Sequence, residues 1–192
     1  MPVQLLLAST SPYRKAQLER LGLTFAQGAP NVDEDALMRS GQDPETIALS
    51  LARAKAEALA SDEAFVLGGD QLVALGDDIL GKPGSAGAAK AQLARLAGRT
   101  HRLISAFALR APDGSMDAGV HVHEMTVRAL SAQEVSRYVD VDSPLDCCGA
   151  YRIEALGISI FESIRGDDPS AIEGLPLMAV CAALRRAGFL VP

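Results

Sequence analysis

The fold of this chain is decided at its start, in the stretch Leu5-Leu6-Leu7-Ala8-Ser9-Thr10-Ser11-Pro12-Tyr13-Arg14. The apolar residues 5–8 predict a buried strand, and Pro12 suits the first turn of a helix with Ser11 as its N-cap. Such a junction brings backbone N–H groups, hydroxyls and the Arg14 guanidinium to one spot, which can hold an anion such as phosphate. An ordinary capped strand–helix junction is the alternative at this point.

The rest of the chain continues this alternation of strand and helix patterns. Helices are expected at 13–21, 44–60, 86–97, 131–139 and 175–187, and strands at 24–26, 65–70, 72–75, 78–80, 102–110, 115–130 and 156–162. Interleaved strands and helices predict an α/β fold with a mixed, twisted sheet flanked by helices. With 192 residues and no clear linker, we expect a single domain of two lobes around a central cleft.

Composition narrows the function classes. The chain is 48% hydrophobic, which argues against disorder, yet no apolar run approaches the ~20 residues that span a membrane. Because the N-terminus also lacks a signal-peptide pattern, we expect a cytoplasmic protein. Three cysteines, an odd number, do not make a disulfide framework. A net charge of −6 disfavours a general nucleic-acid surface.

Several acidic residues stand where they could take part in catalysis or bind a metal. Asp70 comes directly after an apolar run and Gly68-Gly69, while Asp33 and Glu34 stand in a turn after a proline. Carboxylates at strand ends can coordinate Mg²⁺ or act as general bases for water. For Asp33 and Glu34, the alternative is a solvated turn.

Three basic residues are candidates for contacts with phosphate. Arg14 lies at a helix start, Lys55 on an alanine-rich helix and Lys82 in a Gly-Lys-Pro turn. Together with Asp70 and Glu34, they would make a site for a polyphosphate and its metal. The sequence has neither a P-loop pattern nor the Gly-x-Gly-x-x-Gly fingerprint, which makes those two kinds of phosphate site unlikely.

Seven short motifs follow one another along the chain: Leu7-Ala8-Ser9-Thr10-Ser11-Pro12-x-Arg14, Val32-Asp33-Glu34, Ala54-Lys55-Ala56, Gly68-Gly69-Asp70-Gln71, Gly81-Lys82-Pro83, Gly98-x-Thr100-His101 and Gly174-Leu175-Pro176-Leu177. In order and spacing they resemble Maf proteins, the septum-formation-inhibitor-like nucleoside triphosphate pyrophosphatases, and the resemblance covers residues 5 to about 187. The resemblance implies a fold related to inosine triphosphate pyrophosphatases. It also implies cleavage of a nucleoside triphosphate to monophosphate and pyrophosphate with a divalent metal, Mg²⁺ or Mn²⁺, and a homodimer.

The resemblance also implies roles for individual residues. Asp70 would be the proton acceptor, and Glu34 would join it as a metal or water partner. Phosphate contacts would come from Ser9, Arg14, Lys55 and Lys82. One departure is Gly69, where many members have serine, and this change leaves the catalytic carboxylate in place.

Three positions bear on the choice of base: Tyr13, Gln71 and Glu154. An aromatic before the arginine and a glutamate in the later Gly-Ala-Tyr segment resemble the family branch that acts on 7-methyl-GTP. A cationic methylated guanine stacks well on an aromatic face, and its N1–H and N2–H donors suit a carboxylate. The alternatives are a dTTP or UTP pyrophosphatase, and a nucleotide-binding regulator of septum formation with little turnover. Tyr13 as a packing residue and Glu154 as a surface charge also stay open.

Overall fold

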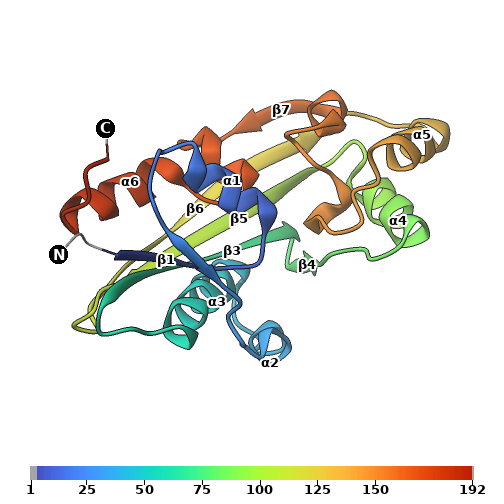
Figure 1. The fold of residues 1–192 in the computed structure, drawn as a ribbon. Coiled ribbons are helices and arrows are strands. Elements are labelled where there is room, and N and C mark those ends of the chain that lie inside the picture. Colours follow the sequence, from blue (N-terminus) through green and yellow to red (C-terminus); the bar gives the residue numbers. More distant parts are fainter. Residues whose placement is uncertain (1–3, 192) are drawn as a thin grey trace. The chain divides into compact units, whose positions relative to one another are not determined.

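The computed structural model describes residues 4–191, in which strands and helices alternate along the chain (Figure 1). The strands are β1 Gln4–Ala8, β2 Ala26–Gly28, β3 Ala64–Leu75, β4 Asp78–Leu80, β5 Thr100–Arg110, β6 Met116–Val127 and β7 Phe161–Arg165. The α-helices are α1 Pro12–Glu19, α2 Glu34–Met38, α3 Pro44–Ala58, α4 Ala86–Leu96, α5 Ala132–Asp142 and α6 Leu177–Arg186. Short 3₁₀ helices are η1 Cys148–Ala150, η2 Leu156–Ile160 and η3 Pro169–Glu173.

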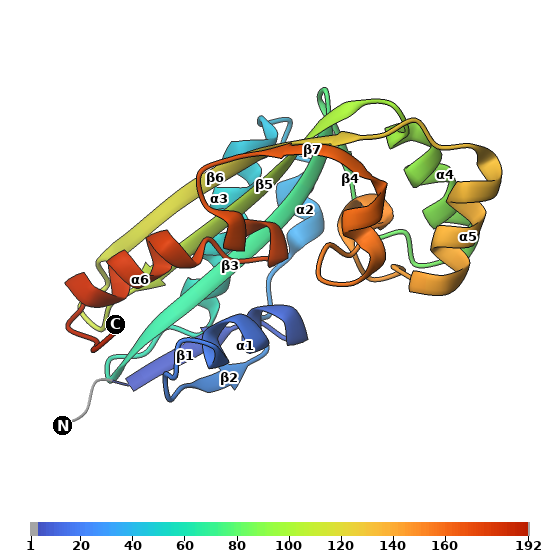
Figure 2. The ribbon, with the colours of Figure 1, turned by 90° about the horizontal axis from the view of Figure 1, so that it is seen from above.

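Within residues 4–191, seven strands form a mixed sheet. Its order is β2-β1-β3-β5-β6-β7, with β4 paired to β3. Strand β1 runs parallel to both β2 and β3, and these three lie side by side in Figure 2. The β3–β4 and β6–β7 pairs are antiparallel. The predicted α/β class with a mixed sheet flanked by helices is therefore confirmed.

The chain divides into two compact units. The first comprises residues 1–71, 105–121 and 168–192, and the second comprises 72–104 and 122–167. The sequence analysis expected a single domain with two lobes around a central cleft. This expectation stays a prediction.

One part of the first unit's core lies on one side of β1 and β3. Leu7, Leu67 and Leu175 are fully buried there, together with residues of α1 and α6 such as Leu18 and Leu184. Helices α1 and α6 lie on this side of the sheet, while α3 lies on the other (Figure 1). The two layers account for the apolar character of β3, since both of its faces are covered.

The second unit contains α4, α5, β4 and β7 and the two 3₁₀ helices η1 and η2. Helix α4 contacts α5 and η1, and α5 contacts η2. His101 is buried against the rings of Tyr151 and Phe161, with centroid distances of 5.5 Å and 6.1 Å. Its Nε2 lies 2.9 Å from the Tyr151 hydroxyl.

Several local predictions are confirmed. Ser11 caps α1 and Pro12 occupies its first turn. Asp43 caps α3, and Ser131 forms a capping box with Glu134 at the start of α5. These signals are local, because each involves a side chain and backbone groups within three residues.

Other predictions are wrong in detail. Strand β3 does not end at Asp70 but continues to Leu75, so this carboxylate lies inside the strand. The expected strand at 156–162 is the 3₁₀ helix η2, and the strand begins only at Phe161. The supposed turn around Glu34 opens a helix, α2, which Asp33 caps. No helix within residues 4–191 is long and apolar enough to cross a membrane.

Candidate functional site

The C-terminal end of β1 delivers the residues that sequence analysis expected to hold an anion. Ser9 follows β1 directly and is 4% exposed. Its Oγ accepts a hydrogen bond from the backbone N–H of Ser11, and the Ser11 Oγ accepts one from the N–H of Arg14. Gln27 on β2 donates to the backbone carbonyl of Ser9 at 2.7 Å. The strand–helix junction is thus fixed by side chains from two neighbouring elements.

Two hydrogen bonds orient the half-buried side chain of Arg14. Its Nε donates to the carbonyl of Gly174 at 3.3 Å, and its Nη1 donates to the Ser9 Oγ at 3.4 Å. Gly174 has φ +133°, and an added Cβ would stand 3.4 Å from the Arg14 side chain. The backbone conformation, which L side chains rarely adopt, therefore favours glycine here.

Side chains along β3 alternate between the two layers of the first unit. Gly68 faces α3 so closely that a Cβ would stand 2.2 Å from the Ala52 carbonyl oxygen. This close approach brings Lys55, on the same helix, beside Asp70, which is two residues beyond Gly68 on the same face. The Nζ of Lys55 lies 2.6 Å from the Asp70 Oδ1.

Glu34, the first residue of α2, completes this cluster from the surface. Its Oε1 lies 2.8 Å from the same Lys55 Nζ. Lys55 and Asp70 are buried, whereas the Glu34 side chain is 54% exposed. One ammonium therefore bridges a buried and an accessible carboxylate, and the cluster carries one positive and two negative formal charges.

Arg14 and the Lys55 cluster meet the sheet where β1 ends beside the middle of β3. Ala8 is paired in register with Gly68, so Ser9 and Gly69 are the next residues of the two parallel strands. A Cβ on Gly69 would stand 3.5 Å from the Arg14 Nε. Because Asp70 follows on the opposite face, cationic groups approach this part of β3 from both layers of the first unit.

The donors present fit a divalent metal such as Mg²⁺. Glu34 and Asp70 offer hard carboxylate oxygens, both within reach of a single point, the Lys55 Nζ. Residues 4–191 hold no group of three or more His, Cys, Asp or Glu side chains suited to a metal. Mg²⁺ commonly takes one or two carboxylates and completes its shell with water and phosphate oxygens, which matches this donor set.

Two of the three residues expected to bear on the base lie in the first unit. Tyr13 is in the first turn of α1 and is half-buried. The Nε2 of Gln71, the residue after Asp70, lies within hydrogen-bond distance of Ser105 Oγ and of the carbonyls of Ala171 and Ile172. The amide N–H groups of Gln71 are therefore engaged with η3.

Lys82 and Glu154 belong to the second unit, where both are exposed. Lys82 stands in the loop between β4 and α4. Glu154 stands in a turn that closes on Arg152, whose carbonyl accepts the N–H groups of Ala155 and Gly157. A Cβ at Gly157 would stand 2.3 Å from that carbonyl oxygen, so the turn requires glycine.

Arg152 is in turn anchored on α5. Its backbone N–H donates to the Tyr138 hydroxyl, and its guanidinium donates to the Asp142 carboxylate at 2.9 Å. The Tyr138 hydroxyl donates to the same carboxylate at 2.7 Å. Burial raises the pKa of Tyr138 well above its usual value, with the hydrogen bond to Asp142 as the second cause. The base of the Glu154 turn is thus fixed by a buried polar network.

Sequence reasoning missed three groups near the end of β1: Gln17, Ser105 and the backbone of residues 170–175. Of these residues, only Gly174 and Leu175 belong to one of the motifs. The hydrogen-bond partners of Gln17 lie 153 and 158 residues away in the chain. The one available signal is that Gln17 follows Arg14 by three residues and so shares its face of α1.

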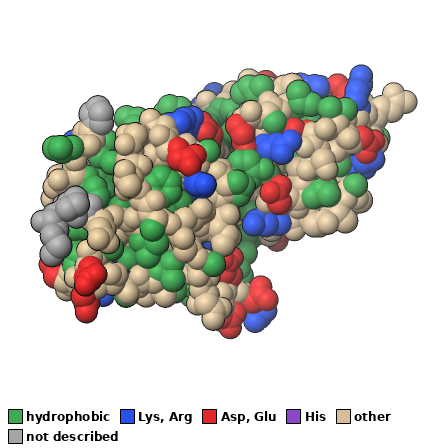
Figure 3. All heavy atoms as spheres, viewed as in Figure 1, with side chains coloured by type: hydrophobic (Ala, Val, Ile, Leu, Met, Phe, Trp, Pro, Cys, Tyr) green, Lys and Arg blue, Asp and Glu red, His purple; other side chains and the backbone are tan. Residues whose placement is uncertain are grey.

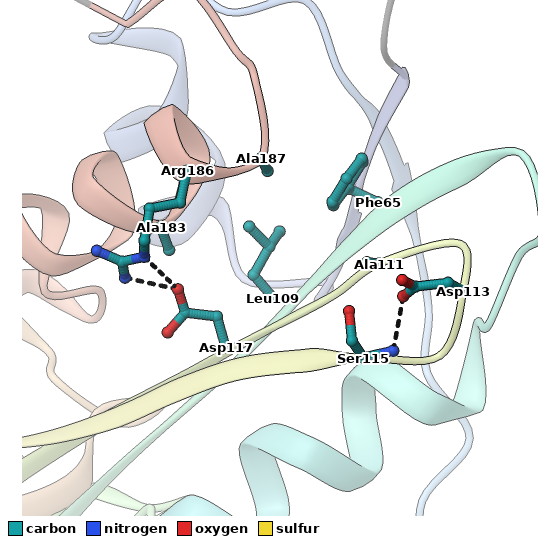
Figure 4. A pocket seen from close by; sticks show the side chains of 9 residues that line it. All are labelled: Phe65, Leu109, Ala111, Asp113, Ser115, Asp117, Ala183, Arg186 and Ala187. Atoms are coloured by element: carbon teal, nitrogen blue, oxygen red, sulfur yellow. Dashed lines mark hydrogen bonds and ion pairs between the residues drawn. The ribbon is translucent and has the colours of Figure 1, made fainter.

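The molecular surface adds little to the site. Figure 3 shows positively and negatively charged side chains scattered over the face drawn, with no continuous patch of Lys and Arg on that face. A pocket of about 350 Å³ lies at the start of β3, where Arg186 pairs with Asp117 and Asp113 accepts the Ser115 N–H (Figure 4). Phe65 in its lining precedes Asp70 by five residues, or about 17 Å along a strand. This pocket is therefore separate from the Asp70 cluster.

Comparisons with known proteins agree on the family. The family model described as "Maf-like protein" matches residues 4–187. A protein named 7-methyl-GTP pyrophosphatase from Xanthomonas campestris pv. campestris (strain 8004) is 44% identical over 194 residues, covering all of both chains. One of the same name from Aromatoleum aromaticum is 42% identical and covers 98% of each chain.

A solved structure supports the fold alone. The HAM1 protein from Coxiella burnetii has a TM-score of 0.51, with 14% sequence identity. The alignment covers 96% of this chain and 99% of that one.

Proposed function

The chain belongs to the Maf family, and on that premise we propose that it hydrolyses 7-methyl-GTP to the monophosphate and pyrophosphate. The observation that carries this proposal is the buried Asp70 carboxylate, which contacts Lys55 on one face of β3, while Arg14 lies against the neighbouring Gly69. The names of the relatives supply the nucleotide. A protein that only bound nucleotides would need no water-activating carboxylate at this position.

In the proposed reaction, Asp70 accepts a proton from a water molecule whose oxygen attacks the α-phosphorus. The bond between that phosphorus and the bridging oxygen breaks, and the electron pair leaves with pyrophosphate. Ser9, Arg14, Lys55 and Lys82 would contact the phosphates, with Arg14 well suited because a guanidinium can bind two phosphate oxygens at once.

Glu34 and Asp70 would hold the divalent metal, Mg²⁺ or Mn²⁺. When bound, the metal would neutralise phosphate charge and polarise the phosphoryl oxygens. The Lys55 ammonium, which contacts both carboxylates, would compete with that metal for them.

For the base, we propose that Tyr13 stacks on the methylated guanine and that Glu154 accepts its N1–H and N2–H groups. A cation over an aromatic face contributes roughly 0.5–2 kcal/mol. A carboxylate matches two adjacent donors, whereas thymine offers one N–H between two carbonyls and would leave Glu154 partly unpaired.

The decisive test is steady-state release of pyrophosphate with Mg²⁺ over 7-methyl-GTP, GTP, dTTP and UTP. The proposal expects the highest kcat/KM for 7-methyl-GTP. A preference for dTTP or UTP would assign the other branch, and binding with negligible turnover would assign a regulatory role. Glu154→Gln should reduce the preference for 7-methyl-GTP over dTTP, with Glu162→Gln, an exposed glutamate on β7, as control.

The homodimer and the cytoplasmic location also stay proposals. Sedimentation velocity of the purified chain would test the homodimer, and cell fractionation would test the location. A monomeric enzyme with full turnover would dismiss the homodimer without affecting the proposed reaction.

A further inference from the structure

The backbone of residues 170–175 is held by three polar side chains from separate elements, two of them buried and one half-buried. Gln17 of α1 donates through Nε2 to the carbonyls of Ser170 and Leu175, at 2.8 Å and 3.1 Å. Ser105 of β5 donates to the Ala171 carbonyl at 2.7 Å. Gln71 of β3 contacts the Ala171 carbonyl at 2.9 Å and the Ile172 carbonyl at 3.1 Å.

These contacts supply donors to carbonyl groups in and next to the short 3₁₀ helix η3. The helix spans five residues, and the backbone N–H groups of Ala171 and Gly174 bond to the carbonyls of Asp168 and Ala171. Carbonyls inside a folded chain require a donor. Gln17 is 1% exposed and Ser105 is fully buried, so water cannot replace them. The conformation of the segment therefore depends on these three side chains.

The same segment contacts the two features of the candidate site on this side of the sheet. The Gly174 carbonyl accepts the Nε–H of Arg14 at 3.3 Å. Leu175 packs on the strand residue before Asp70, because a Cβ on Gly69 would stand 2.7 Å from its Cδ2. A shift of the segment would displace the acceptor that fixes the plane of the Arg14 guanidinium.

We propose that Gln17, Gln71 and Ser105 are positioning residues that hold residues 170–175 so that Gly174 orients Arg14 toward a phosphate group. This inference rests on the proposed function in taking Arg14 as a phosphate contact. It assigns Gln71 a role that is independent of the base, since its amide N–H groups face the backbone of η3. Preorganisation of Arg14 lowers the ordering cost of binding a polyphosphate.

The test uses a probe without a base, inorganic tripolyphosphate, and isothermal titration calorimetry on the full chain. Gln17→Met and Gln71→Met keep the side-chain length and remove the amide donors. Ser105→Ala is the mildest variant, because the Gln71 amide still faces the Ala171 carbonyl. Gln133→Met is the matched control, since this glutamine is exposed on α5 in the second unit.

Tripolyphosphate should bind about tenfold more weakly to both methionine variants in the segment, and less so to Ser105→Ala. KM should rise by a similar factor for 7-methyl-GTP and for dTTP, so that their ratio of kcat/KM stays constant. Unchanged tripolyphosphate affinity in folded Gln17→Met and Ser105→Ala would overturn the proposal. A change in the nucleotide ratio for Gln71→Met, at constant tripolyphosphate affinity, would make Gln71 a base-reading residue instead.

A double-mutant cycle separates positioning from a merely structural role. In an Arg14→Met background, Gln17→Met should cause no further loss of tripolyphosphate affinity, because the group it positions is gone. An equal loss with and without Arg14 would show that Gln17 acts on the fold generally and would refute the inference. Since this readout needs no turnover, absent pyrophosphate release would count against the proposed function alone.

Discussion

The ammonium of Lys55 lies 2.6 Å from the carboxylate of Asp70, and both side chains are buried. The pair forms because Gly68 lets α3 approach β3 to within contact of its backbone. Lys55 also reaches the exposed Glu34 at 2.8 Å. The candidate base is therefore held by a cation that also contacts its proposed partner in metal binding, and this arrangement has consequences for turnover and for metal affinity.

Replacing Asp70 by asparagine tests the proposed base directly. The amide keeps the shape and can accept from Lys55, but it cannot take up a proton from water. We expect pyrophosphate release to fall by at least about 100-fold, since a positioned general base contributes that much or more. Circular dichroism would confirm folding, and Asp113→Asn on an exposed turn is the control. Full turnover in Asp70→Asn would mean that another group activates the water.

Replacing Lys55 by methionine should separate metal affinity from activity. A divalent cation bound by Glu34 and Asp70 competes with the ammonium that contacts both, and like charges at such distances repel strongly. We expect Mn²⁺, followed by electron paramagnetic resonance, to bind about tenfold more tightly to Lys55→Met, while turnover falls.

The matched control for that variant is Lys90→Met, which removes a lysine paired with Asp140 at 2.8 Å in the second unit. It should bind Mn²⁺ as the parent protein does. Weaker Mn²⁺ binding to Lys55→Met would show that Lys55 supports the metal site instead of competing with it.

Gly69→Ser, which restores the serine of the family pattern, should destabilise this chain. The new Cβ would stand 2.7 Å from the Cδ2 of the fully buried Leu175. Overpacking of this kind costs about 1–3 kcal/mol in the free energy of unfolding. Leu175→Val in the same chain should recover part of the loss, which urea unfolding would measure. Gly69→Ser with unchanged stability would show that Leu175 moves aside freely.

The parts of the fold that were predictable are those that local chemistry determines. Ser11 and Pro12 start α1, and Asp43 starts α3, because a cap needs only residues within one turn. The hydrogen bonds of Gln17 could not be predicted in this way, because its partners Ser170 and Leu175 are distant in sequence. Its buried amide becomes interpretable only when the first unit is assembled.

The wrong boundaries have similar causes. Gly68 and Gly69 resemble the end of a strand, yet β3 continues because glycine there serves close packing against α3 and Leu175. The alternation in residues 156–162 resembles a strand, but Gly157 donates to the Arg152 carbonyl and closes a turn. For the candidate site, the roles of Asp70, Lys55 and Glu34 were expected from the resemblance to the Maf family, whereas their direct contact required the structure.

Acid should weaken the second unit through His101. Burial lowers the pKa of His101 from 6.5 to about 4, and its Nδ1 has no hydrogen-bond partner within the described residues. Between these values the unfolded chain takes up a proton that the folded chain does not, so the free energy of unfolding falls as pH falls from 6.5 to 4. The contribution is fully present above pH 6.5, and its loss amounts to at most about 3 kcal/mol.

His101→Gln removes this titration and keeps a polar group for the Tyr151 hydroxyl. Urea unfolding at pH 8 gives the intrinsic cost of the substitution, because the ring is neutral in both states there. Between pH 6.5 and 4.5 the stability of the variant should fall less steeply than that of the parent, by up to about 1.4 kcal/mol per pH unit. Equal slopes for the two proteins would mean that His101 takes up its proton in the folded state as readily as in the unfolded one.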